Sequence, residues 1–251
     1  MYHSDEFSRR ISPYIDDEAQ SETPVMTQLS KSRAILLICS LNVTVTIGAI
    51  NTGMMTVTLP KIGEALHMSR GLLLWPALIY SLTCGCTLLL MGAVADVVGN
   101  RIINLIGTFG SSVFILAAGL ARSSLQLIVF RGLQGISIAM CFPTSVSILS
   151  AAFPSGSARN LAFGCLGLGT PLGFAIGILL GGWFESTSIG WRPGYYYTAA
   201  LAAALFMVNC WCLPYEGRRE RKVWSRLQSD IDWIGILISS TSMGLISYSL
   251  A

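Results

Sequence analysis

Residues 160–184 read NLAFGCLGLGTPLGFAIGILLGGWF, a stretch in which glycine recurs at every fourth position. The recurring residues are Gly169, Gly173, Gly177 and Gly181. In a water-soluble helix each glycine costs about 1 kcal/mol relative to alanine. In a bilayer, small residues instead let two helix backbones approach closely. The pattern therefore predicts a transmembrane helix whose glycine stripe packs against one long partner helix.

The composition of the whole chain is that of a membrane protein. Hydrophobic residues make up 53% and charged residues 12% of the 251 residues, whereas roughly a quarter of a soluble domain is charged. Apolar stretches of about 20 residues are long enough to span a bilayer. They fall at 34–59, 72–92, 102–121, 125–149, 160–184 and 195–213, and a seventh starts near Trp233. We expect an all-α polytopic membrane protein with six complete spans and an incomplete seventh.

The spans suggest four parts of the chain. Residues 1–33 are polar and lack an apolar pattern, which is typical of a disordered tail. Residues 34–213 hold a bundle of six transmembrane helices, and residues 214–232 form a basic loop. Residues 233–251 begin the seventh helix. Because the loops within the bundle are short, we expect helices that follow each other in sequence to be antiparallel neighbours.

The distribution of basic residues predicts how the protein sits in the membrane. Most Lys and Arg residues fall on the side that holds residues 1–33 and 214–232. The positive-inside rule then places the N-terminus in the cytoplasm. The net charge of +3 reflects this topology, so we expect the lipid bilayer as a partner and no nucleic acid.

No cofactor or metal site is expected. All seven cysteines lie inside apolar spans. Two of the pairs are two residues apart, which on a helix directs them to different faces. Free cysteines in such surroundings pack as small hydrophobic residues.

Arg131 is the one charged residue that lies well inside a complete span. An arginine at the centre of a bilayer costs about 2.5–3.5 kcal/mol on insertion scales. Helical spacing puts Arg131, Gln134 and Gly135 on one face, and we expect this face to line a central cavity or gate. The alternative is that the arginine extends toward the lipid headgroups.

A second polar group lies in the predicted turn at 92–101, GAVADVVGNR. Gly92 and Gly99 permit a tight reversal, and Asp96 can cap the following helix. Arg101 can pair with a carboxylate at another helix end. A hydrogen-bonded turn of this kind can hold helices together in one conformation and release them in another. We call these four residues the cytoplasmic latch.

At these positions the chain resembles the N-terminal half of a major facilitator superfamily transporter. The latch resembles the family pattern Gly-x-Leu-Ala-Asp-Arg-x-Gly-Arg-Arg, with Val97 and Asn100 in place of basic residues. Arg131, Gln134 and Gly135 match the Arg-x-x-Gln-Gly signature of the fourth helix. The resemblance implies the six-helix N-terminal bundle of that family, so residues 34–213 are expected to fold in this way.

The glycine stripe resembles the antiporter motif of the family's fifth helix, Gly-x8-Gly-x3-Gly-Pro-x2-Gly-Gly. Ile178 replaces the motif's proline. The resemblance implies a packing role for every glycine of the motif. These glycines are Gly164, Gly173, Gly177, Gly181 and Gly182.

Two further segments resemble the fourteen-span drug:proton antiporter branch. The short segment before the seventh span ends in Asp-Trp-Ile-Gly at 232–235, as in that branch. Asn51 stands where the branch carries an aspartate, so it can hydrogen-bond a substrate but cannot carry a proton. The sequence at 51–55, NTGMM, resembles the fungal aminotriazole-resistance-like subgroup. Tyr80, Met54 and Met55 are candidates for an adaptable cavity wall, with simple packing as the alternative.

The resemblance implies a transporter and not an enzyme. We expect export of drugs or secondary metabolites by proton antiport, with alternating access around a site between two bundles. The resemblance also implies a small-molecule substrate as a partner and a location in the plasma membrane, with the vacuolar membrane as the alternative. A second half-transporter bundle would be required as a partner. One alternative is a truncated, non-transporting membrane remnant or scaffold. Another is a facilitator of a small polar solute, which the absence of Asp and Glu from the complete spans favours.

Overall fold

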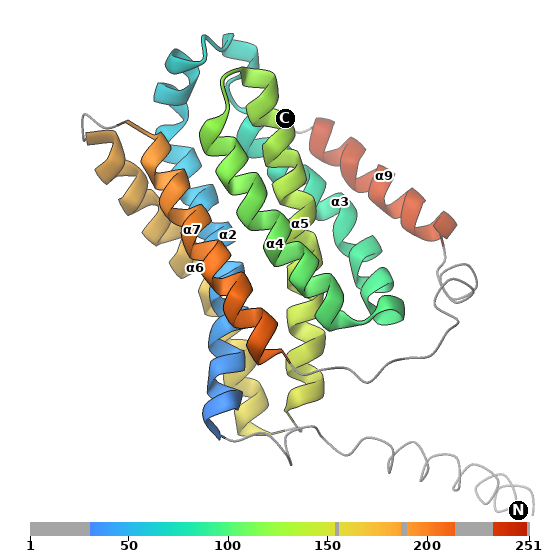
Figure 1. Ribbon diagram of the computed structural model, residues 1–251. Coiled ribbons are helices and arrows are strands. Elements are labelled where there is room, and N and C mark those ends of the chain that lie inside the picture. The colour runs from blue at the N-terminus through green and yellow to red at the C-terminus, as the bar shows by residue number, and fades with distance from the viewer. Residues whose placement is uncertain (1–30, 154–155, 187–189, 214–232, 250–251) are drawn as a thin grey trace, which may run out of the picture.

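The computed structural model describes residues 31–153, 156–186, 190–213 and 233–249. All regular structure in these residues is helical (Figure 1). The predicted basic loop at 214–232 and nearly all of the predicted tail at 1–33 lie outside the described residues. The elements are α2 (Lys31–Ala65), η2 (Arg70–Leu72), α3 (Trp75–Val98), α4 (Asn100–Leu120), α5 (Ser124–Ala152), α6 (Ser157–Ser186), α7 (Arg192–Cys212) and α9 (Trp233–Ser249).

The helices occur where the apolar stretches predicted them. Among the described residues, five helices are long and apolar enough to cross a membrane, namely α2 to α6. Three tyrosines and Asn209 lower the hydropathy of α7, and α9 has 17 residues. The all-α prediction and the six-helix bundle, followed by the start of a seventh helix, are confirmed.

The packing of the helices differs from the prediction that sequence neighbours pack together. α2 packs mainly on α6 and also on α7, α3 packs on α5, and α4 packs on α5 and α7. Figure 1 shows α6 and α7 beside α2, and α9 on the outer side of α3. Short loops determine the direction of successive helices, but close contacts form where small residues lie. The expectation therefore holds for α4 with α5, which follow each other in the chain, and was wrong for α2 with α6, α3 with α5 and α4 with α7.

The glycine stripe of α6 lies directly against the backbone of α2. A Cβ atom placed on Gly173 would lie 2.6 Å from the carbonyl oxygen of Thr46, and one on Gly177 would overlap the carbonyl oxygen of Ile50. The contact is reciprocal, because a Cβ atom on Gly53 of α2 would overlap the Phe174 carbonyl oxygen. The two backbones thus touch without intervening side chains, as the four-residue repeat predicted.

Two glycines of the predicted antiporter motif do not take part in this contact. A Cβ atom on Gly164 or Gly182 would meet nothing within 4 Å in the described structure. Both lie off the stripe that Gly169, Gly173 and Gly177 form on α6. Their predicted packing role is not seen, because the helical period directs them away from α2.

Single glycines allow close contact at the other main interfaces. A Cβ atom on Gly107 of α4 would lie 2.7 Å from the carbonyl oxygen of Ser137 in α5. One on Gly119 would lie 2.8 Å from Cβ of Tyr195 in α7. Gly135 of α5 meets the backbone of α3 in the same way. The bundle is therefore held by backbone-level contacts at several helix pairs.

We predict that Gly177→Ala destabilises the protein, whereas the matched variant Gly164→Ala does not. The added methyl group at Gly177 would force α2 and α6 apart, and such overpacking typically costs about 1–3 kcal/mol. At Gly164 the methyl group has open space and improves helix propensity by up to about 1 kcal/mol. Thermal unfolding of the two purified variants in detergent measures the difference. Equal melting temperatures would contradict the role assigned to the stripe.

Candidate functional site

The predicted turn at 92–101 is shorter than the sequence suggested. α3 continues to Val98 and α4 starts at Asn100, so Gly99 alone separates the two helices. Gly99 has φ 116°, in the region that glycine adopts without strain. Gly92 lies within α3 and takes no part in the reversal. Asp96 also lies within α3, and Gly99 occupies the N-cap position of α4 that was predicted for Asp96.

Arg101 makes a contact that the sequence did not reveal. Its Nη2 atom donates a hydrogen bond to the carbonyl oxygen of Cys210 at 3.1 Å. Cys210 lies in the last turn of α7, where free carbonyl groups carry the negative end of the helix dipole. This acceptor is a backbone carbonyl at another helix end. Arg101 thus connects the start of α4 to the end of α7.

Arg131 is completely buried, so the alternative in which it extends to the lipid headgroups was wrong. Its Nη1 atom donates hydrogen bonds of 3.0 Å to Asn51 Oδ1 and to Gln134 Oε1. The Nδ2 group of Asn51 in turn donates to Thr198 Oγ1 at 3.1 Å. These four residues form a continuous polar network that joins α5, α2 and α7. We call it the Arg131 network.

The Arg131 network also has unused hydrogen-bond donors. Nε and Nη2 of Arg131 and Nε2 of Gln134 are buried and have no hydrogen-bond partner among the described residues. Both amide oxygens that Arg131 contacts belong to uncharged side chains. Because a buried charge normally requires a partner of opposite sign, the positive charge of Arg131 is incompletely compensated by the residues that the structure describes.

Asn51 does not line a cavity, contrary to its expected contact with a substrate. It is fully buried, and both ends of its amide are used within the network. Met54 and Met55, the other candidates on α2, are also fully buried. The sulfur of Met55 lies 2.8 Å from the hydroxyl of Tyr195. The alternative of simple packing therefore holds for both methionines.

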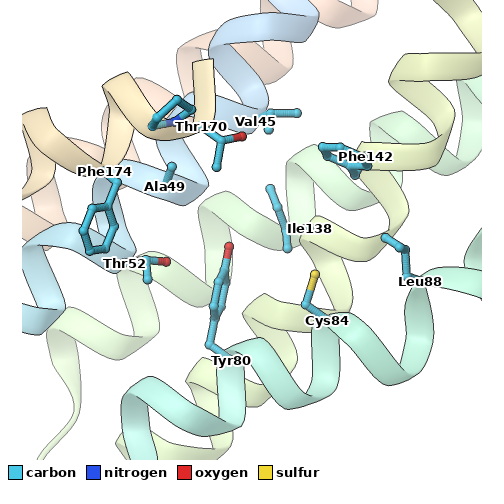
Figure 2. A pocket seen from close by; sticks show the side chains of 11 residues that line it. Val45, Ala49, Thr52, Tyr80, Cys84, Leu88, Ile138, Phe142, Thr170 and Phe174 are labelled. Carbon is cyan, nitrogen blue, oxygen red and sulfur yellow. The ribbon is translucent and has the colours of Figure 1, made fainter. Parts of the chain in front are cut away.

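A cavity of about 500 Å³ lies between α2, α3, α5 and α6. Figure 2 shows Tyr80, Cys84 and Leu88 on one side of it and Phe174 and Thr170 on the other. The wall is apolar except for a few hydroxyl groups and one thiol. It consists of Val45, Ala49, Thr52, Tyr80, Cys84, Leu88, Ile138, Phe142, Thr170, Pro171 and Phe174.

Tyr80 connects the cavity to the Arg131 network. Its ring lines the cavity (Figure 2), and the guanidinium carbon of Arg131 lies 5.3 Å from the ring centroid, within cation–π distance. None of Arg131, Gln134, Gly135 and Asn51 lines the cavity itself. Gly135 instead allows α5 to approach the backbone of α3 at Tyr80. The part of α5 that was predicted to line the cavity therefore lies behind the Tyr80 side chain, which separates Arg131 from the cavity.

Sequence reasoning missed most of the cavity wall. Ile138 and Phe142 continue the helical face of Gln134 and Gly135 at i+4 spacing, and this was the available signal. On α6, Thr170 directly follows Gly169 and Phe174 directly follows Gly173, so both lie on the face next to the glycine stripe. No comparable signal marks the wall residues of α3, because that helix is apolar on all sides.

Together these features define a polytopic helical membrane protein with a buried cationic network behind an apolar cavity. A family model described as Major Facilitator Superfamily matches residues 41–250. The chain belongs to the major facilitator superfamily. Its resemblance to that family in sequence is thereby confirmed at the level of the superfamily.

Individual relatives agree with this assignment. MFS-type transporter 1 of Pyricularia oryzae is 37% identical over 249 residues, which is 88% of this chain and 40% of the relative. The multidrug efflux pump LfrA of Mycolicibacterium smegmatis is 32% identical over 160 residues, which is 64% of this chain and 32% of the relative. The chain therefore spans two fifths or less of the length of these relatives.

The fold is also that of a solved transporter. A crystal structure of a bacterial homologue of the human lysosomal transporter Spinster, inward-facing and unoccupied, superposes with a TM-score of 0.62 at 19% identity. The match covers 77% of this chain and 47% of the solved chain. The similarity therefore concerns one part of a larger transporter fold.

We predict that Asn51→Leu lowers stability by about 1–3 kcal/mol, because it removes two buried hydrogen bonds and leaves polar partners unsatisfied. Asn51→Asp should keep most of the stability, since a carboxylate at this position still accepts from Arg131 and adds the opposite charge. Thermal unfolding of the purified variants compares them. If Asn51→Leu had the same melting temperature as the wild-type protein, the network would have no structural role.

Proposed function

We propose that this chain forms the N-terminal half of an exporter of small organic compounds, driven by proton antiport. The apolar cavity beside a buried cationic network is the observation that carries the proposal. Membership of the superfamily supports transport, and the multidrug efflux pump among the relatives supports export. The cargo would be drugs or secondary metabolites, and transport requires no enzyme chemistry.

We further propose that the protein belongs to the fourteen-span drug:proton antiporter branch, near its fungal aminotriazole-resistance-like subgroup. The motif at 232–235 and the sequence at 51–55 support this placement. The 37% identity to a transporter of the fungus Pyricularia oryzae agrees with a fungal subgroup. The distribution of basic residues supports a cytoplasmic N-terminus, and export of foreign compounds suits the plasma membrane, with the vacuolar membrane as the alternative.

A second bundle would complete the substrate site. α3 and α6 border the cavity, yet they carry exposed large side chains such as Leu78, Leu89, Leu172 and Phe174. A second half-transporter bundle packed against this side would close the cavity at the bilayer midplane, and rocking of the two bundles would give alternating access. The chain spans two fifths of its relative's length, which agrees with one bundle of two.

The proton must be carried by a group other than the residues described at the cavity. Asn51 cannot titrate, and the complete spans of this chain contain no Asp or Glu. We propose that a carboxylate of the second bundle carries the proton. The same observation favours the alternative of a facilitator, which needs no proton carrier, so coupling to a proton gradient is the decisive measurement.

The experiment uses the full-length gene product in proteoliposomes. Three aromatic dyes would be offered, namely ethidium as a cation, fluorescein as an anion and Nile red as a neutral compound. Proton antiport predicts that an imposed pH gradient drives uphill movement of at least one dye and that a protonophore abolishes it. Downhill flux of a dye that does not depend on the pH gradient would support the facilitator. Absence of flux for every dye would support the non-transporting scaffold.

Alternating access can be followed with a native thiol in the cavity wall. Cys84 lines the cavity, whereas Cys141 is completely buried. In two single-cysteine backgrounds, we predict that a membrane-impermeant maleimide labels Cys84 from one side at a time and that a transported dye reduces its labelling. Cys141 should stay unlabelled. Simultaneous labelling of Cys84 from both sides would contradict alternating access.

The cytoplasmic latch would stabilise one of these two states. We propose that Arg101, which tethers the start of α4 to the end of α7, acts with Asp96 and Gly99 in this role. Arg101→Ala should then change the ratio of Cys84 labelling from the two sides by several-fold without altering insertion in the membrane. An unchanged ratio would leave the contact with Cys210 as a purely structural one.

A further inference from the structure

The described cavity wall carries no charged side chain. Three aromatic rings, those of Tyr80, Phe142 and Phe174, and the hydroxyl groups of Thr52 and Thr170 are its most polarisable and polar groups. A wall of this kind favours an aromatic ligand, because ring contacts and apolar burial supply most of the attraction. Within this wall, nothing discriminates between charge types by direct contact.

Discrimination between ligand charges arises from Arg131, which lies behind the cavity wall. The guanidinium carbon of Arg131 lies 5.3 Å from the centroid of the Tyr80 ring, and Tyr80 faces the cavity (Figure 2). Arg131 is fully buried, so water screens its charge less than that of an exposed arginine. In low-dielectric surroundings such a charge acts over several ångströms. The cavity therefore experiences the field of a cation.

No group of opposite sign cancels this field among the described residues. The two acceptors of Arg131, Asn51 Oδ1 and Gln134 Oε1, belong to neutral amides. Two of the three guanidinium nitrogens have no hydrogen-bond partner in the part of the chain that the structure describes. Asp and Glu are absent from all six complete spans, and Glu64, Asp96 and Glu185 lie near helix ends. The charge of Arg131 thus acts inside the cavity with little compensation from the described residues.

We propose that this cavity selects neutral and anionic aromatic compounds and rejects organic cations. The inference rests on the proposed function, because it assigns the substrate class of the same cavity. The Tyr80 ring transmits the selection, since a guanidinium on one side of the ring draws electron density from it. The opposite side then stacks better with electron-rich aromatic rings than with cationic ones.

The size of the effect can be bounded from the Coulomb law. At an effective dielectric constant of about 20, a cation held in the cavity against Tyr80 is disfavoured by enough to weaken its binding at least tenfold. An anion of the same shape gains a comparable factor. We therefore expect an anionic and a cationic dye with the same ring system to differ clearly in affinity.

The experiment measures equilibrium binding to the purified full-length protein. The two probes are fluorescein, an anion, and tetramethylrhodamine ethyl ester, a cation, which share the xanthene ring. Fluorescence polarisation should give at least about tenfold tighter binding for fluorescein. Equal binding, tighter binding of the cation or binding of neither dye would overturn the proposal.

A substitution in the cavity wall gives a second, independent test of the proposal. Thr52 lines the cavity and is not one of the four residues of the Arg131 network. Its hydroxyl is bonded to the Gly48 carbonyl oxygen and also contacts the Tyr80 hydroxyl. Thr52→Asp should raise the affinity for the cationic dye at least about tenfold and lower that for fluorescein, whereas the matched variant Thr52→Asn should change neither. If Thr52→Asp fails to fold, Thr170→Asp tests the same point, with Thr170→Asn as its control. An unchanged preference in a folded aspartate variant would overturn the proposal.

The outcome is separable from that of the proposed function. Binding is measured without a gradient, so selective binding of fluorescein together with the absence of gradient-driven flux would reject proton antiport and keep the substrate class. Gradient-driven flux of ethidium together with weak binding of fluorescein would support proton antiport and reject the proposed substrate class.

Discussion

The bundle depends on the direct contact between the backbones of α2 and α6. Gly173 and Gly177 of α6 leave no room for a side chain against Thr46 and Ile50 of α2, and Gly53 is equally constrained in the opposite direction. This contact fixes the rotation of α2 about its axis. The face of α2 that carries Asn51 is then turned toward α5 and α7, where it meets Arg131 and Thr198. The Arg131 network is therefore a consequence of the glycine contact.

The Arg131 network in turn limits how the bundle can move. A buried guanidinium that loses its amide partners would be left uncompensated in an apolar interior, at a high cost in free energy. α2, α5 and α7 are joined by this chain of hydrogen bonds and by a second bond, from Asn209 to Thr44. We infer that these three helices move as one body.

Much of the fold could be predicted from the sequence, because the bilayer imposes long apolar stretches and glycine spacing reports helix contacts. The helices and the partner face of α6 follow from these two signals alone. The sequence could not show which helix would receive the glycine stripe, because contacts between helices distant in the chain depend on several interfaces at once. For the same reason, Gly164 and Gly182 matched a family motif without packing against α2.

The candidate site was predictable only in part. The rarity of an arginine in a span marked Arg131 correctly, and its spacing from Gln134 predicted their shared face. Its bonding to Asn51 joins helices far apart in sequence, so it could not be read from either one. The turn at Gly99 was predicted in type but not in length, because an apolar helix can continue through polar residues when its ends reach the membrane surface. The cavity wall on α3 lacked any distinguishing pattern.

The two faces of α6 differ in how freely they can vary. On one face, any residue larger than glycine at Gly173 or Gly177 would meet the main chain of α2, so substitution there affects the whole bundle. On the adjoining face, Thr170 and Phe174 border an open cavity and are themselves exposed. Substitutions that reshape the cavity wall can therefore occur one residue away from positions where an added side chain would separate two helices. A single helix thus combines a sterically constrained joint with an adaptable surface.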